Sequence, residues 1–122
     1  MSQQFILVFA ALLGMLGIIF GAFGAHLLKK KLTSEQLTSF ETGVKYQMYH
    51  AIVLLVLGFN FEYTSPISYW LFTIGILFFS FSIYGLVLSN SKGKKMKFLG
   101  PITPIGGLLL LFGWITIITS FL

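Results

Sequence analysis

The sequence predicts an all-α membrane protein in which four transmembrane helices form one compact bundle. The first observation is the composition: 57% of the 122 residues are hydrophobic and only 9% are charged, whereas soluble domains carry about 25% charged residues. The second is that four apolar runs approach the roughly 20 residues that a helix needs to cross a bilayer. The chain has no Cys, which excludes disulfide scaffolds and Cys-based metal sites.

These runs predict a single integral membrane domain over residues 1–122. The spans are expected at about 5–28, at 45–59 with a helical lead-in from 34, at 67–89 and at 102–122. The first run resembles a signal peptide in its hydrophobicity, but its Lys residues follow the apolar stretch instead of preceding it. A signal peptide has the opposite order, so we expect this helix to be retained.

The second helix has a clear predicted start. Thr33 and Gln36 have the spacing of a capping box, in which each side chain binds the other residue's backbone amide. The residues that follow place Leu37, Phe40 and Val44 on one helical face, with polar residues elsewhere. This pattern predicts an amphipathic lead-in lying at the membrane interface before the helix enters the bilayer.

Proline residues indicate where the third and fourth helices begin. Ser65 followed by Pro66 predicts an N-cap with proline in the first turn. Pro101 and Pro104 bracket the start of the fourth span, where a missing amide hydrogen costs least. Trp114, near the end of that span, fits an interfacial anchor.

The positive charges predict the orientation in the membrane. All eight basic residues are lysines, and they fall between spans one and two and between spans three and four: Lys29, Lys30, Lys31, Lys45, Lys92, Lys94, Lys95 and Lys97. The positive-inside rule places both groups in the cytoplasm and both termini outside. We expect the lysines to attract anionic lipid headgroups. Without Arg or a soluble surface, nucleic-acid binding is not expected.

Small residues recur at helical spacing within three of the spans. Since helices in lipid associate mainly through close packing, such stripes predict tight helix–helix seams. The positions are Gly14, Gly17, Gly21 and Gly24 in the first span, Gly75 and Ser82 in the third, and Gly106, Gly107 and Gly113 in the fourth. The pattern leaves open whether a seam lies within the chain or between subunits, and we expect the protein to form a homo-oligomer.

Two histidines are the candidates for chemistry in or near the membrane. His26 ends the first span, and His50 lies in the second beside Tyr46, Gln47 and Tyr49. We expect both histidines near the cytoplasmic interface, where they could be neighbours. Ionisable groups at membrane depth are candidate functional sites, and three roles are open: structural positioning, contact with lipid, proton or substrate, and metal or haem binding. Two His without a third ligand make a poor metal site, so we expect no metal or cofactor.

Three segments together resemble a known family. They are Gly21–His26, Tyr46–His50 and Pro101–Gly107 with the following Gly113–Trp114 pair. In this order the chain resembles the YgdD/YwdK-like family, small bacterial inner-membrane proteins with eukaryotic relatives and a domain of unknown function. The resemblance implies four spanning helices, an inner-membrane location and no established reaction or substrate. It draws attention to His26, Tyr46, Gln47, His50, Pro104, Gly106 and Gly107.

The sequence favours a non-enzymatic structural or membrane-organising role. A serine–histidine–acid set, a phosphate-binding loop and a metal-ligand trio are all missing from the sequence, which disfavours an enzyme. A small oligomeric transporter or channel is one alternative. The three acids, Glu35, Glu41 and Glu62, fall outside the apolar runs, so only the histidines could carry protons. The other alternative is a lipid- or quinone-binding protein that uses His26, His50 and Tyr46.

Overall fold

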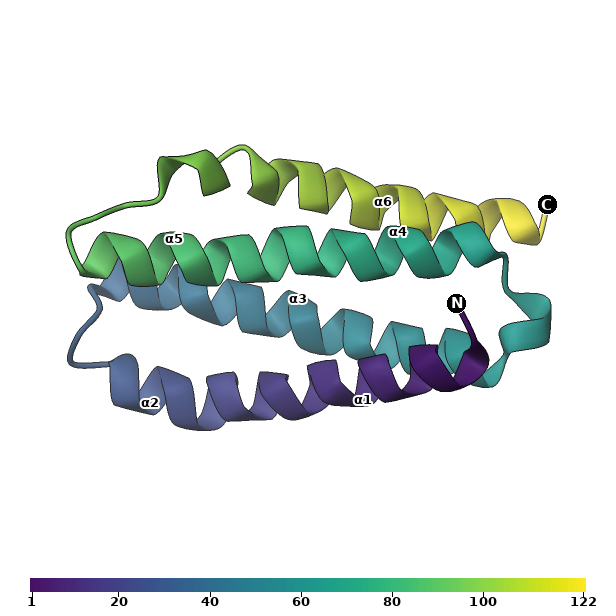
Figure 1. Cartoon of the computed structure of the whole chain (residues 1–122), viewed down its shortest axis with the longest axis horizontal. Coiled ribbons are helices and arrows are strands. Elements are labelled where there is room, and N and C mark those ends of the chain that lie inside the picture. The colour runs from purple at the N-terminus through teal and green to yellow at the C-terminus, as the bar shows by residue number, and fades with distance from the viewer.

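The computed structural model describes residues 1–122 and contains helices without any strand (Figure 1). Four long helical segments run antiparallel and are joined at alternating ends. The all-α class predicted from the sequence is therefore confirmed. The segments are α1 (Gln3–Ile18) continuing through the π-helical turn η1 (Ile19–Gly24) into α2 (Ala25–Leu28); α3 (Ser34–Phe59); α4 (Pro66–Ile76) continuing through the π-helical turn η3 (Leu77–Phe81) into α5 (Ser82–Ser91); and α6 (Ile102–Ser120).

The helix starts follow the capping signals closely. The Thr33 hydroxyl accepts from the Gln36 amide at 3.1 Å, and the Gln36 side-chain oxygen accepts from the Thr33 amide at 3.0 Å, so the capping box is present. Ser65 is the N-cap of α4 with Pro66 in the first turn, but its side chain makes no capping hydrogen bond. Pro101 is the N-cap of α6. Short 3₁₀ turns, η2 (Phe61–Tyr63) and η4 (Lys97–Leu99), occupy the connections before α4 and α6.

The predicted lead-in to the second helix forms the first turns of α3, and its position at the membrane interface stays a prediction. α3 runs without interruption from Ser34 to Phe59. Phe40 is only 3% exposed and packs against the Tyr84 ring, with a centroid distance of 5.1 Å. Gly43 beside it faces the same ring. The apolar stripe therefore packs against α5 inside the protein, because an aromatic partner there offers better burial than a surface position.

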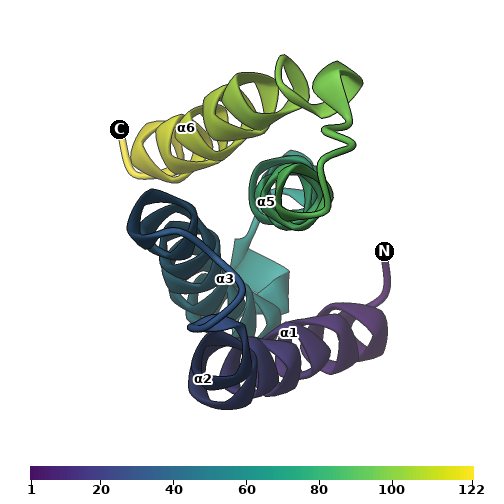
Figure 2. The ribbon, with the colours of Figure 1, turned by 90° about the vertical axis from the view of Figure 1, so that its left-hand side faces the viewer.

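The helices pack mainly in chain order, with α3 near the middle. α1 packs chiefly on α3, α3 packs also on α4, η3 and α5, and α6 packs on α4 and η3. Viewed end-on, α1 and α6 lie on opposite sides of α3 and α5 (Figure 2). The backbones of α3 and α6 approach each other little. The bundle is therefore more open than the compact arrangement expected from the sequence.

Several of the predicted small residues lie at close helix contacts within the chain. A Cβ atom added at Gly17 would clash with the Met48 side chain, and one at Gly21 would lie 3.0 Å from Val44 Cγ1, so this part of the stripe faces α3. Gly24 is looser, at 3.6 Å from the Phe40 ring. Gly14 has no neighbouring atom within 4 Å.

The contact between α6 and the α4–α5 segment is the tightest. A Cβ at Gly106 would overlap the backbone of residues 78 and 79 in η3, while one at Gly107 would reach only the Phe79 ring at 3.7 Å. A Cβ added at Gly75 would lie 3.0 Å from the Leu110 backbone nitrogen, and one added at Gly113 would lie 2.9 Å from the Phe72 ring. Two hydroxyl pairs also join these segments, Ser82 with Thr103 and Ser68 with Thr116.

The two ends of the molecule differ in charge. Both termini lie at one end, while the loop after α2 and the loop between α5 and α6 lie at the other (Figure 1). The Lys residues of those two loops are therefore gathered at a single end. Three helical segments, Gln3–Leu28, Pro66–Ser91 and Lys97–Ser120, are long and apolar enough to span a membrane. α3 does not meet this criterion, so a fourth span remains a prediction.

Candidate functional site: a lateral pocket between α3 and α6

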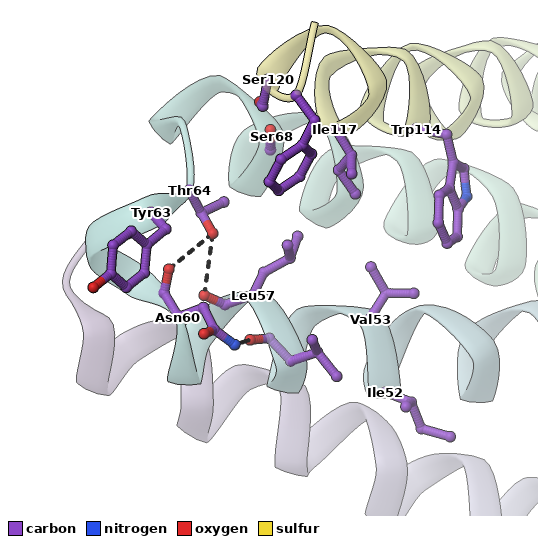
Figure 3. A pocket seen from close by; sticks show the side chains of 12 residues that line it. Ile52, Val53, Leu57, Asn60, Tyr63, Thr64, Ser68, Trp114, Ile117 and Ser120 are labelled. Atoms are coloured by element: carbon purple, nitrogen blue, oxygen red, sulfur yellow. Dashed lines mark hydrogen bonds between the residues drawn. The ribbon is translucent and has the colours of Figure 1, made fainter.

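A pocket of about 590 Å³ lies where α3 and α6 diverge. It extends to the end of the molecule that carries the termini, where Asn60, Tyr63 and Thr64 line it (Figure 3). This volume is within the range of small-molecule sites, about 300–1,000 Å³. The lining residues are Ile52, Val53, Val56, Leu57, Asn60, Tyr63, Thr64, Ser68, Trp114, Ile117, Ser120 and Phe121.

The pocket changes from polar to apolar along its length. Asn60, Tyr63 and Thr64 lie at one end, and Ile52, Val53 and Trp114 lie towards the other (Figure 3). The side chains at the polar end are held by hydrogen bonds to the backbone. The Thr64 hydroxyl donates to the Asn60 carbonyl oxygen at 3.0 Å, and the Asn60 side-chain amide donates to the Val56 carbonyl oxygen at 2.8 Å. These bonds complete the C-terminus of α3, whose last carbonyls lack partners within the helix.

The apolar end of the pocket is closed by a hydrogen bond between two helices. The indole N–H of Trp114 on α6 donates to Nε2 of His50 on α3 at 3.2 Å, and the ring centroids lie 6.1 Å apart. Phe72 of α4 packs edge-on against the indole from a third side, at a centroid distance of 5.6 Å. His50 is only 4% exposed. The His50–Trp114 contact therefore forms the floor of the pocket, that is, its apolar end.

The hydrogen-bond partners of His50 determine which of its ring nitrogens carries the hydrogen. Nδ1 lies 2.8 Å from the Tyr46 carbonyl oxygen, which can only accept, so Nδ1 carries the hydrogen. Nε2 faces the Trp114 indole, which can only donate, so Nε2 is the acceptor. One donor and one acceptor describe the neutral imidazole. The arrangement therefore uses both ring nitrogens of His50 within the protein.

Gln47, one turn before His50, belongs to a different network. Its side-chain amide donates to the Leu13 carbonyl oxygen of α1 at 2.8 Å, and its oxygen accepts from the Tyr84 hydroxyl of α5 at 2.6 Å. Nearby, the Ser80 hydroxyl donates to the Gly43 carbonyl oxygen at 2.7 Å. Gln47 is fully buried. It therefore ties three helices together and offers no free polar atom to a ligand.

The polar cluster expected from the sequence is divided in the structure. His26 is exposed on α2, and it lies beyond Leu13, the level of Gln47, by about 20 Å along the helix axis. The two histidines are therefore not neighbours. Tyr46 is 40% exposed and Tyr49 is 53% exposed, and their rings contact each other at a centroid distance of 5.8 Å.

Sequence reasoning missed two of the partners. Trp114 was expected to act as an interfacial anchor, but its indole binds His50. Tyr84 was not singled out, although it holds Gln47. A signal was present in both cases, because a polar group inside an apolar span needs a partner in a neighbouring helix. What the sequence lacked was the information on which helices are neighbours.

A second hollow, of about 700 Å³, lies at the lysine end between the start of α3, α5 and the start of α6. It is mainly polar, with Glu35, Gln36, Ser39, Asn90, Lys95 and Thr103 among its lining residues. No buried side-chain nitrogen or oxygen in the molecule lacks a hydrogen-bond partner. No group of three or more His, Asp or Glu side chains is placed to hold a metal ion.

Comparison with known proteins places the chain in a family. The family model described as "Protein of unknown function (DUF423)" matches residues 20–107, which include all of α3 and the π-helical turn η3. The chain belongs to this family. The resemblance noted from its three sequence segments is thereby confirmed. No solved structure gives a significant match to the chain.

Individual relatives agree with this assignment. The UPF0382 membrane protein of Staphylococcus aureus is 42% identical over 97% of this chain and 95% of its own length. YwdK of Bacillus subtilis, named a UPF0382 membrane protein, is 36% identical over 93% of both chains. YgdD of Escherichia coli K12, named a UPF0382 inner membrane protein, is 34% identical over 93% of this chain and 86% of its own. Together with its apolar helices, these relatives identify the chain as a membrane protein.

Proposed function

We propose that this protein resides in the bacterial inner membrane and binds the hydrocarbon chain of a membrane amphiphile in its α3–α6 pocket, without catalysing a reaction. The observation that carries the proposal is the pocket itself: about 590 Å³, apolar towards Trp114 and polar towards Asn60. In a bilayer the surrounding molecules have the same division into an apolar tail and a polar head. Such a molecule could lie in the pocket with both parts matched.

The lysines support an orientation for this ligand. If both Lys-rich loops lie in the cytoplasm, as the positive-inside rule predicts, the termini and the polar end of the pocket lie on the outer side. A ligand would then keep its head at the outer interface and point its tail towards the His50–Trp114 floor. The cytoplasmic lysines would attract anionic headgroups of the opposite leaflet. Bound lipid and surface lipid would therefore be separate populations.

The glycine seams support an internal structural role. Gly17, Gly21, Gly106 and Gly113 all make their close contacts within the chain, and these contacts hold α1 and α6 to the central helices. Gly14 alone in the first stripe has open space beside it. The seams therefore support the rigidity of the walls around the pocket, and they provide no basis for proposing an oligomer.

A proton-driven transporter has less support. That alternative depended on His26 and His50 acting together, but His26 lies on the exposed end of the first helical segment. Both nitrogens of His50 are engaged by Tyr46 and Trp114. No observation favours this function over lipid binding, and we do not propose it.

Native mass spectrometry of protein released gently from nanodiscs tests the proposed function. Val56 lines the pocket and is 54% exposed, so Val56→Phe adds bulk to the pocket without disturbing the core. Val8 on α1 is 53% exposed and lies outside the pocket, so Val8→Phe is a matched control. We expect one retained lipid in the wild type and in the control, and loss of it in Val56→Phe. Equal retention in both variants contradicts the proposal.

A further inference from the structure

We propose that the α3–α6 pocket selects amphiphiles with an uncharged, hydroxyl-bearing head; this inference rests on the proposed function and specifies its ligand. The first observation is that no charged side chain lines the pocket. A charged group that leaves water needs a partner of opposite charge. An uncharged head needs only hydrogen bonds, and the polar end of the pocket can supply them.

The helix ends around the mouth disfavour an anionic head in particular. α3 ends at Phe59 and α6 ends at Ser120, so two helix C-termini meet at this end of the pocket. Each carries a partial negative charge because the peptide dipoles of a helix are aligned. α4 begins here, with Pro66 in its first turn, and α1 begins at the same end at Gln3, whose side-chain amide donates to the Gly58 carbonyl oxygen and not into the pocket. Glu62 is the one charged side chain in the neighbouring η2 turn.

The lysines that could neutralise a phosphate lie elsewhere. Those that follow α2 and α5 lie at the end of the molecule opposite the termini (Figure 1), and Lys45 lies within α3, about 22 Å along the helix axis from Asn60. A Lys after α2 or α5 would be separated from the mouth by the length of α3, whose 26 residues extend about 39 Å at 1.5 Å per residue. Charges so far apart are screened at physiological ionic strength, where the Debye length is about 8 Å. A phosphate-bearing head would therefore find no lysine side chain at this pocket.

The pocket favours a ligand that carries hydroxyl groups, because its own hydrogen-bond donors are already engaged within the protein. The Asn60 amide donates to Val56, the Thr64 hydroxyl to Asn60, and the Ser120 hydroxyl to the Thr116 carbonyl oxygen at 2.7 Å. The oxygen atoms of these three side chains retain lone pairs that can accept. A ligand that donates hydrogen bonds, as a glycerol head does, would satisfy them. A phosphocholine head has no hydrogen to donate.

The opposite end of the pocket favours a plain hydrocarbon tail. Trp114 and His50 satisfy each other there, and Ile52 and Val53 provide only carbon. A polar group on the tail would meet no free partner at this depth and would lose its hydrogen bonds on binding. Selection therefore operates at the head, while the tail is recognised by its apolar character.

Fluorescence quenching by brominated amphiphiles tests the head selection. The Trp70→Phe variant leaves Trp114, which lines the pocket, as the only tryptophan. Three probes share a dibrominated stearoyl tail: the monoglyceride, the lysophosphatidylglycerol and the choline ester, each added to nanodiscs at equal mole fraction. We expect saturable quenching, with half-saturation by the monoglyceride at about tenfold lower mole fraction, equivalent to about 1.4 kcal/mol.

The outcomes separate this inference from the proposed function. Equal half-saturation for the three probes, or a preference for either charged probe, overturns the head selection and leaves tail binding intact. Quenching that rises linearly with every probe shows no pocket binding, and both proposals then fail. The Tyr63 side chain is 81% exposed, and the one hydrogen bond that Tyr63 donates is from its backbone amide to Asn60, so Tyr63→Lys should preserve the fold. It should bring the half-saturation for lysophosphatidylglycerol close to that of the monoglyceride, and an unchanged ratio counts against the inference.

Discussion

Trp114 of α6 donates its indole hydrogen to Nε2 of His50 on α3 across 3.2 Å. The backbones of these two helices approach each other little, so this side-chain bond is a principal link between them. It also closes the apolar end of the lateral pocket. One hydrogen bond thus contributes both to the assembly of the helices and to the shape of the proposed binding site.

Removing the indole hydrogen should weaken the attachment of α6. Trp114→Phe leaves Nε2 of the buried His50 without a donor, and we expect a loss of about 1 kcal/mol in the free energy of unfolding. His50→Leu should cost a similar amount, and the double variant should cost less than the sum. Unfolding titrations in mixed micelles measure all three. Trp70→Phe, an exposed tryptophan on α4, is the control, and strictly additive losses for the His50 and Trp114 variants would argue against the bond.

The protonation state of His50 can be observed directly. Since Nδ1 donates to Tyr46 and Nε2 accepts from Trp114, we expect ¹⁵N spectra at pH 7 to show the neutral Nδ1–H tautomer. Protonation would place a second N–H against the indole N–H, which is unfavourable. In Trp114→Phe the Nε2 acceptor loses its donor, so its ¹⁵N signal should move away from the wild-type position while the Nδ1 signal changes little. An imidazolium signal for wild-type His50 at pH 7 is incompatible with this geometry.

Gly106 should tolerate no side chain. Its Cβ position lies 2.8 Å from the Phe78 carbonyl carbon and closer still to the Phe79 amide nitrogen, and backbone atoms cannot move aside as a flexible side chain can. We expect Gly106→Ala to cost about 3 kcal/mol or more. Gly107→Ala is a matched control, because its new atom would reach only the Phe79 ring at 3.7 Å, and the cost should stay below about 1 kcal/mol. Thermal unfolding of the two variants tests this. A lower melting temperature for Gly106→Ala than for Gly107→Ala agrees with the close backbone contact, and equal melting temperatures contradict it.

The Gln47 network should be cooperative. Gln47→Leu removes the acceptor of the Tyr84 hydroxyl and leaves that group buried and unpaired. We expect a loss of about 1–3 kcal/mol. Adding Tyr84→Phe to Gln47→Leu should recover part of that loss, since the unpaired hydroxyl is then gone. Tyr63→Phe, at an 81% exposed position, should have no effect. If the double variant is less stable than Gln47→Leu alone, the Tyr84 hydroxyl has a partner other than Gln47, and the proposed network is contradicted.

The fold could be predicted largely from the sequence because the bilayer limits the choices. Uninterrupted apolar runs are helical in lipid, and Thr33 with Gln36 marks the start of α3 through a purely local interaction. The packing partner of the α3 lead-in could not be predicted, for a non-local reason. Phe40 is buried by Tyr84, which lies in another helix and cannot be found by examining the pattern of α3 alone.

The candidate site was less predictable for the same reason. His50 and Gln47 stand three residues apart, yet they serve different neighbours: α6 through Trp114, and α1 with α5 through Leu13 and Tyr84. Local spacing suggested one cluster that also included His26, which lies at the exposed end of the first segment. The pocket itself depends on α3 and α6 diverging, a property of the packing order that no single helix encodes.

Intermolecular NOEs between protein methyl groups and lipid acyl chains test most directly whether the pocket holds hydrocarbon. Val53 lines the pocket and is partly buried, while the next residue, Leu54, is fully buried in the core and is the internal reference. In nanodiscs with protonated lipid and otherwise deuterated protein, we expect cross-peaks from the Val53 methyl groups to acyl methylenes and none from Leu54. If Val53, like Leu54, shows contacts only to other protein methyl groups, the pocket is filled by the protein itself and lipid binding there is ruled out.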